Sequence, residues 1–185
     1  GGGISLDVQL TTPTFASLSG GAAGTTITNN GASGTKTLTL NAASGTTTYA
    51  GKITDGPTAL IALSKTSTSE QILSGTNSYS GLTTVSGGTL TITGTHSGAG
   101  ATTVSGSARI NVNNAGALSS GLFTMTSGTL DNTSGAAITN QTNNPSVFIG
   151  ACTYGTAAIT DSSHDLNLGS GSVTYFGAGT PGITF

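Results

Sequence analysis

Charged residues are the scarcest class in this sequence: they make up 5% of its 185 residues, against roughly 25% in ordinary soluble domains. The basic residues are scattered along the chain, at Lys36, Lys52, Lys65 and Arg109. No basic patch therefore predicts binding to nucleic acid. The chain also lacks an apolar run of the ~18 residues that a membrane-spanning helix requires, so we expect no membrane span.

Cysteine and proline are rare as well. The single cysteine, Cys152, cannot form an internal disulfide, and one cysteine with two distant histidines does not favour a zinc site. Proline occurs 4 times, and glycine has no three-residue period, which excludes a collagen triple helix. The sequence begins Gly1-Gly2-Gly3-Ile4 without a signal-peptide pattern, so we expect a mature product or an excised segment.

The remaining sequence consists largely of Gly, Ser, Thr, Ala and Asn, which raises the question of disorder. Disordered chains usually carry a high net charge, whereas the net charge here is -2. The apolar residues also alternate with polar ones, as half-buried strands require. This alternation occurs at 4–10, 37–40, 89–92, 110–112, 165–168 and 172–175. Turn-forming residues separate these segments, and no segment has ten residues of helical periodicity. The sequence therefore predicts an all-β fold.

The strand segments repeat about every 20 residues. Thr83–Gly87 returns as Thr102–Gly106, a similar segment occupies 124–128, and Leu90, Ile110 and Leu130 share one spacing. Such a period predicts a right-handed parallel β-helix, or β-solenoid, because the apolar face of one coil is buried only against its neighbours. We expect one domain over residues 1–185, with the clearest repeats at 65–132. Roughly nine coils at a rise of about 4.8 Å would give a rod on the order of 45 Å long.

This register also predicts which side chains face the core and what the bends contain. We expect the following residues inside: Leu73, Val85, Leu90, Ile92, Val104, Ile110, Val112, Met125 and Leu130. Glycine at the bends is expected to supply positive φ. Asparagines at bends can stack into hydrogen-bonded ladders, and the alternative is an ordinary turn role. The candidates are Asn111, Asn113, Asn114, Asn132, Asn143 and Asn144.

Residues 73–90 read Leu-Ser-Gly-Thr-Asn-Ser-Tyr-Ser-Gly-Leu-Thr-Thr-Val-Ser-Gly-Gly-Thr-Leu. This stretch resembles the autotransporter-associated β-strand repeat, also called the passenger-associated transport repeat, whose motif runs approximately L-S-G-x-N-x-Y-[ST]-G-x-T-x-V-x-x-G-x-L. The upstream pair Lys65-Thr66 matches a Lys-Thr pair that often precedes the motif, and Ser67 stands where glycine is usual. The resemblance covers about 30 residues. It implies secretion, a right-handed parallel β-helix and large surface or fibre-forming proteins, and it implies no catalytic residues.

Residues that carry chemistry are few. Glycoside hydrolysis usually needs two positioned carboxylates, and the nearest cluster of acidic residues is Asp161-Ser162-Ser163-His164-Asp165. That cluster could serve as an acid/base pair or as part of a Ca²⁺ loop, but we interpret it as a polar turn. We likewise expect Asp131 to be a solvated turn residue. No pattern of nucleophile, base and acid occurs, so we predict no enzyme activity and no catalytic, cofactor or metal site.

Three further side chains have a structural and a functional interpretation. Glu70 and Lys65 could form an exposed ion pair of little energetic value. His96 is expected in a surface loop. Tyr79 belongs to the motif and is expected to pack beside a bend, the alternative being a platform for stacking sugars.

The main hypothesis for function is a structural segment or subunit of an extracellular fibre at the bacterial cell surface. Its partners would be further solenoid coils or other copies joined end to end. An alternative is an adhesin-type module that binds glycans or cell surfaces through loops 94–100 or 140–157, with Phe148 and Tyr154 as aromatic candidates. A less favoured alternative is ice binding by a row at Thr89, Thr91 and Thr93. We expect that row to be broken in the next coil, by Ala108, Ile110 and Val112.

Overall fold

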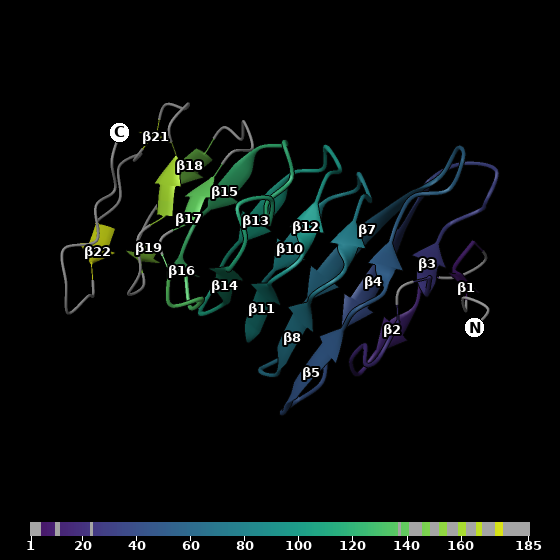
Figure 1. Ribbon diagram of the computed structural model, residues 1–185, viewed down its shortest axis with the longest axis horizontal. Coiled ribbons are helices and arrows are strands. Elements are labelled where there is room, and N and C mark those ends of the chain that lie inside the picture. Colours follow the sequence, from purple (N-terminus) through teal and green to yellow (C-terminus); the bar gives the residue numbers. More distant parts are fainter. Residues whose placement is uncertain are drawn as a thin grey trace.

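The computed structural model describes residues 5–9, 12–22 and 24–136 in full. Beyond these it describes the strands at 138–140, 146–148, 152–154, 159–161, 166–167 and 173–175. No helix occurs in these residues, and every strand pairing among them is parallel. The strands stack along the long axis of the molecule in successive coils (Figure 1). The all-β solenoid predicted from the sequence is confirmed.

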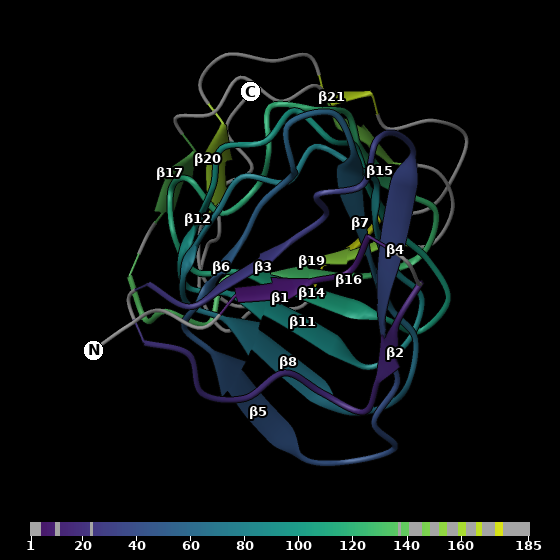
Figure 2. The ribbon, with the colours of Figure 1, turned by 90° about the vertical axis from the view of Figure 1, so that its right-hand side faces the viewer.

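Most coils place one strand on each of three faces, which surround a central core (Figure 2). In the coil that leads to β15, residues 113–122 form no strand on face A. Face A contains β1 (Ser5–Asp7), β3 (Thr26–Thr28) and β6 (Lys52–Ile53), then β9 (Thr76–Asn77) and β12 (Thr95–His96), then β17 (Ile138–Asn140) and β20 (Ile159–Asp161). Face B contains β2 (Thr14–Phe15), β4 (Thr35–Leu40), β7 (Leu60–Lys65), β10 (Thr83–Val85), β13 (Thr102–Val104), β15 (Phe123–Met125), β18 (Ser146–Phe148) and β21 (Leu166–Asn167). Face C contains β5 (Thr46–Tyr49), β8 (Glu70–Leu73), β11 (Thr89–Ile92), β14 (Arg109–Val112), β16 (Gly128–Asp131), β19 (Cys152–Tyr154) and β22 (Val173–Tyr175).

The predicted register holds in the middle of the solenoid. Leu90 lies beside Ile110, and Ile110 lies beside Leu130 in the next coil. Earlier coils are longer: 24 residues separate Thr47 from its hydrogen-bonded neighbour Gln71. The continuously described part, up to residue 136, makes about six turns of roughly 21 residues, and β18 and β21 continue the stack on face B. The right-handed winding stays a prediction from the general preference of parallel crossovers.

The core contains every residue that the period predicted to face inward, each exposed by 7% or less. Strands β10, β13 and β15 show the reason, because their first and third residues are buried while the middle one is only half-buried. Burying one such aliphatic side chain contributes about 1.5–3 kcal/mol. Stacking therefore stabilises a sequence whose separate coils would expose most of this apolar surface.

Glycines at the corners allow the coils to approach closely. A Cβ atom on Gly75 would lie 2.0 Å from the carbonyl oxygen of Gly51, and one on Gly94 would lie 2.0 Å from that of Gly75. The same relationship joins Gly100 to Gly81, at 2.2 Å. None of these glycines has a positive φ. The expectation that bend glycines supply positive φ is confirmed at other bends, including Gly88 (φ +61°), Gly106 (+66°) and Gly128 (+103°). At the corners of Gly75, Gly94 and Gly100 the missing side chain is what matters.

Candidate functional site

Polar side chains in and beside the best-preserved repeat form a column at the corner between faces A and B, which we call the buried polar column. Asp55 is half-buried in it, and its other members are buried. The column consists of Asp55, Asn77, Tyr79 and His96, from three successive coils. Asn77 ends β9 and lies beside His96, which ends β12. The two are 1% and 4% exposed, and Tyr79 is 1% exposed. Buried polar groups of this kind are costly unless each finds a hydrogen-bond partner.

The side chain of Asn77 takes the place of a backbone hydrogen-bond acceptor between β6 and β9. Its Oδ1 accepts a hydrogen bond from the backbone N–H of Ile53 at 2.9 Å, and its Nδ2 donates to the carbonyl of Gly75 at 3.3 Å. The backbone N–H of Ser78 donates to the carbonyl of Ile53 at 2.9 Å. Face A is divided between β6 and β9 at this place. The asparagine amide keeps the two coils bonded there.

Asp55 joins the corner of its own coil to the next coil. One carboxylate oxygen accepts the backbone N–H of Ile61 at 2.7 Å, and the other accepts that of Ser80 at 2.8 Å. Both bonds are charge-assisted, which makes them stronger than neutral ones. The carboxylate therefore holds this bend and joins it to the next coil.

Tyr79 and His96 stack inside this corner. Their ring centroids are 4.2 Å apart with an angle of 34° between the planes, and His96 Nε2 lies 2.8 Å from the carbonyl oxygen of Tyr79. The Tyr79 hydroxyl bonds Thr83 Oγ1 at 2.8 Å. Burial raises the pKa of Tyr79 well above its usual value. Tyr79 packs at a bend as expected, and its burial leaves no platform for a sugar.

The surface location expected for His96 is wrong. In the next coil, Gly98 takes the place that corresponds to Tyr79, and a Cβ atom there would lie 1.9 Å from the Tyr79 carbonyl oxygen. The missing side chain makes room for the imidazole above the phenol ring. Burial lowers the pKa of His96, while the Tyr79 carbonyl and the charge of Asp55 act in the opposite direction. Segment 94–100 is likewise no outward loop, because Gly94, His96, Gly98 and Gly100 are buried in alternation.

Lys65 is fully buried at the corner between faces B and C, so the exposed ion pair expected with Glu70 does not form. Its Nζ donates to the carbonyl of Ser67 and, at 3.3 Å, to that of Gly87. Burial lowers the pKa of Lys65. Glu70 instead accepts hydrogen bonds from Thr46 at 3.1 Å and from Thr91 at 2.6 Å.

Face C corrects two other expectations. Asp131 is not a solvated turn residue: it ends β16, is 4% exposed and forms an ion pair with Arg109 of the neighbouring coil. Thr91 is 3% exposed, so the threonine row proposed for ice binding is not continuous at the surface. In the next coil, Arg109 lies beside Thr89 and Asn111 lies beside Thr91. The row is therefore broken, although by other residues than expected.

The candidate asparagines bond between coils, but their described bonds are to threonine or backbone and not to one another. Asn111 donates to Thr91 Oγ1 at 2.9 Å, and Asn113 donates to Thr133 Oγ1 at 2.8 Å. Asn114 and Asn132 accept backbone N–H groups two residues further on, as ordinary turn asparagines do. Asn143 and Asn144 lie outside the described residues.

The other candidates fall in the C-terminal part. Of the cluster Asp161–Asp165, only the backbone of Asp161, at the end of β20, is described. Loop 140–157 contains β18 and β19, which hold the backbones of Phe148, Cys152 and Tyr154, and their side chains lie outside the description. Within the described residues, no group of three or more His, Cys, Asp or Glu side chains could hold a metal ion.

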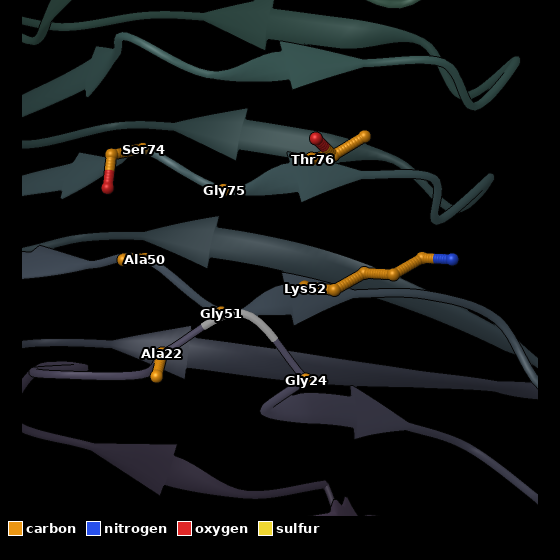
Figure 3. A pocket seen from close by; sticks show the side chains of 8 residues that line it. All are labelled: Ala22, Gly24, Ala50, Gly51, Lys52, Ser74, Gly75 and Thr76. Carbon is orange, nitrogen blue, oxygen red and sulfur yellow. The ribbon is translucent and has the colours of Figure 1, made fainter. Parts of the chain in front are cut away.

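A shallow groove of about 330 Å³ crosses three coils at the corner between faces C and A (Figure 3). Small residues line it, and Lys52 is the one charged residue among them. The lining residues are Ala22, Gly24, Ala50, Gly51, Lys52, Ser74, Gly75 and Thr76. Gly51 and Gly75, which stack on each other in successive coils, account for this groove, because corners without side chains leave a depression on the outside.

The family comparison concerns the stretch that contains Asn77 and Tyr79 of the buried polar column; Asp55 and His96 lie just outside it. Residues 63–92 match the model of the Passenger-associated-transport-repeat family. The match covers 30 of the 185 residues, so this segment is similar to a passenger-associated transport repeat. Comparisons with curated proteins and with solved structures found no significant match. In the described residues no helix is long and apolar enough to cross a membrane.

The structure explains most of the repeat's signature residues by contacts between or within coils. Leu73, Val85 and Leu90 fill the core, and Gly75 and Gly81 lie against carbonyl groups of the preceding coil. The signature hydroxyl of Thr83, which is 2% exposed, bonds Tyr79. Gly88 has a φ of +61° and lies beside Lys65 Nζ. Together, the repeat and the solenoid define a passenger-like β-helix segment.

Proposed function

We propose that this chain is a structural, non-enzymatic length of extracellular β-solenoid, a segment or subunit of a bacterial cell-surface fibre or passenger. The observation that carries the proposal is the buried polar column. The side chains of Asp55, Asn77 and His96 bond inside the solenoid and tie one coil to the next. Lys65 of the transport repeat does the same at the corner between faces B and C. Polar side chains that bond one coil to the next in this way support the proposal of a structural scaffold.

Continuation at the ends is the second part of the proposal. β1 and β2 stand at the ends of their sheets and have a strand partner on one side only. Such edges pair readily with another strand, and charge normally discourages the pairing. The first described coil carries one ionised side chain, Asp7, and it accepts hydrogen bonds from Gln9 and Asn30. Further coils, from the same polypeptide or from another copy, would complete the ladder.

Three experiments test this function. Antibodies against the purified chain are expected to label intact cells of the source bacterium as strongly as permeabilised ones; label seen only after permeabilisation would contradict a surface location. Electron microscopy with light scattering should show rods that lengthen as concentration increases. Breakdown of a polysaccharide by the purified chain, abolished by Asp161→Ala, would overturn the non-enzymatic assignment.

A further inference from the structure

The outward side of face B carries an apolar column that follows the solenoid axis. We define this Leu-Ala column as Ala62, Leu82, Ala101 and Leu122, each immediately beside its neighbour in the next coil. The backbone bonds fix the register: Leu63 N–H donates to the carbonyl of Leu82, Thr83 N–H to that of Ala101, and Thr102 N–H to that of Leu122. The column therefore alternates small and large residues over four successive coils.

The two leucines project from this surface. Leu82 is 47% exposed and Leu122 is 42% exposed, and they are two of the four large apolar side chains that are exposed among the described residues. Between and beside them lie alanines: Ala62 is buried and Ala101 is half-buried. The surface is thus a regular series of ridges and hollows, one coil apart.

Uncharged hydroxyl groups flank the apolar column. The adjacent column on the same face consists of Thr39, Ser64, Thr84, Thr103 and Thr124, in register through five coils. Beyond it lie Thr66, Ser86, Ser105 and Thr126. None of these side chains is ionised, so a second surface of the same kind would meet neither like-charge repulsion nor the cost of burying a charge.

We propose that this side of face B pairs with the same side of a second copy, the two solenoids running antiparallel. A twofold axis along the strand direction, between the coils of Leu82 and Ala101, sets Leu82 opposite the partner's Ala101 and Leu122 opposite the partner's Ala62. Each ridge then enters a hollow, and each such contact occurs twice, as in a closed isologous dimer. With parallel solenoids, a twofold axis along the solenoid keeps each coil opposite the same coil. Leu82 then faces the partner's Leu82, or one of its hydroxyl-bearing side chains if the copies are shifted sideways, and never an alanine hollow.

The size of the surface determines how strong this pairing is. Four coils at about 4.8 Å and strand segments of about 15 Å give on the order of 300 Å² per copy. Stable interfaces bury roughly 800 Å² per partner. The isolated chain therefore forms a weak, concentration-dependent dimer. This lateral pairing uses face B and is independent of the end-to-end continuation proposed above.

Cross-linking tests the register directly. Ser64→Cys and Thr124→Cys, each combined with Cys152→Ser, place single thiols three coils apart on face B. A short bis-maleimide is the suitable linker, because stacked sheets lie about 10 Å apart, farther than a disulfide spans. We expect cross-linked dimers when the two variants are mixed and little cross-linking of either variant alone. Cross-linking of each variant to itself, or of neither combination, overturns the antiparallel pairing.

A second measurement does not depend on introduced thiols. Replacing both Leu82 and Leu122 by Asp should abolish the dimer in sedimentation equilibrium at high concentration, with the circular dichroism spectrum unchanged. The softer replacement of both by Ser should weaken it, should the Asp variant fail to fold. Thr48→Asp is the matched control, because Thr48 is exposed but lies on face C, away from both proposed contact surfaces. Equal loss in the control, or no loss in the face B variants, refutes the lateral surface.

Discussion

The imidazole of His96 stacks on the phenol ring of Tyr79, one coil away, and the same imidazole bonds the backbone carbonyl of Tyr79 at 2.8 Å. His96 thereby joins its own coil to that of Tyr79. The residue of its coil that corresponds to Tyr79 is Gly98, which has no side chain to make this contact. His96 is the imidazole in this corner, and burial lowers its pKa. The contact therefore makes the stability of the solenoid depend on pH.

We predict that stability decreases as the pH falls below about 6.5, the value for a solvated histidine. Burial lowers the pKa of His96 in the folded chain, so the unfolded chain binds more protons between the two pKa values. The stabilisation is full above the unfolded pKa and is lost on acidification towards the folded one. Asp55 is the charged group nearby, and it opposes this shift. Thermal melts of wild type and His96→Asn from pH 5 to 8 isolate the effect, which should be absent in the variant. If the melting temperatures of wild type and variant changed equally with pH, this prediction would be refuted.

Loss of the hydroxyl group should change the stability of the chain differently at two buried tyrosines. Tyr79→Phe leaves Thr83 without its partner and should destabilise the chain by about 1 kcal/mol. The Tyr49 hydroxyl is buried without a hydrogen-bond partner, so Tyr49→Phe should be neutral or stabilising by a similar amount. Urea denaturation of both variants gives the comparison. A loss of stability in Tyr49→Phe equal to that in Tyr79→Phe would contradict the hydrogen-bond assignments.

The sequence was sufficient for the strands, the core and the middle register, because period-two alternation and a 20-residue repeat both derive from burial. It was not sufficient for His96, Lys65 and Asp131, which were expected to be solvated because polar residues usually are. One signal for His96 was available. Thr95-His96-Ser97-Gly98 lies one period after Thr76-Asn77-Ser78-Tyr79, so the histidine occupies an inward position of the repeat. Lys65 similarly shares its position with Val85 of the next coil.

Corner glycines should tolerate no side chain where they contact backbone. Gly75→Ala and Gly94→Ala each place a methyl group 2.0 Å from a carbonyl oxygen of the preceding coil. Such overpacking costs typically 1–3 kcal/mol. Gly116→Ala is the control, since its methyl group would meet a threonine side chain at 3.3 Å and no closer atom. Melting temperatures should fall clearly in the first two variants and little in the third; equal decreases would mean that close approach of the coils is not the reason for glycine.

Lys65 is expected to stabilise the corner between faces B and C through its ammonium group. Lys65→Met keeps most of the buried aliphatic stem but removes the donor to the carbonyls of Ser67 and Gly87. Leaving such acceptors unpaired costs about 1–3 kcal/mol, and this cost is partly offset because a buried charge is also removed. We therefore expect a net loss near the lower end of that range. Lys52→Met, at an exposed position, should change stability by less than about 0.5 kcal/mol. Chemical denaturation at pH 7 measures both. A Lys65→Met variant as stable as wild type would show that the lysine contributes only its apolar stem.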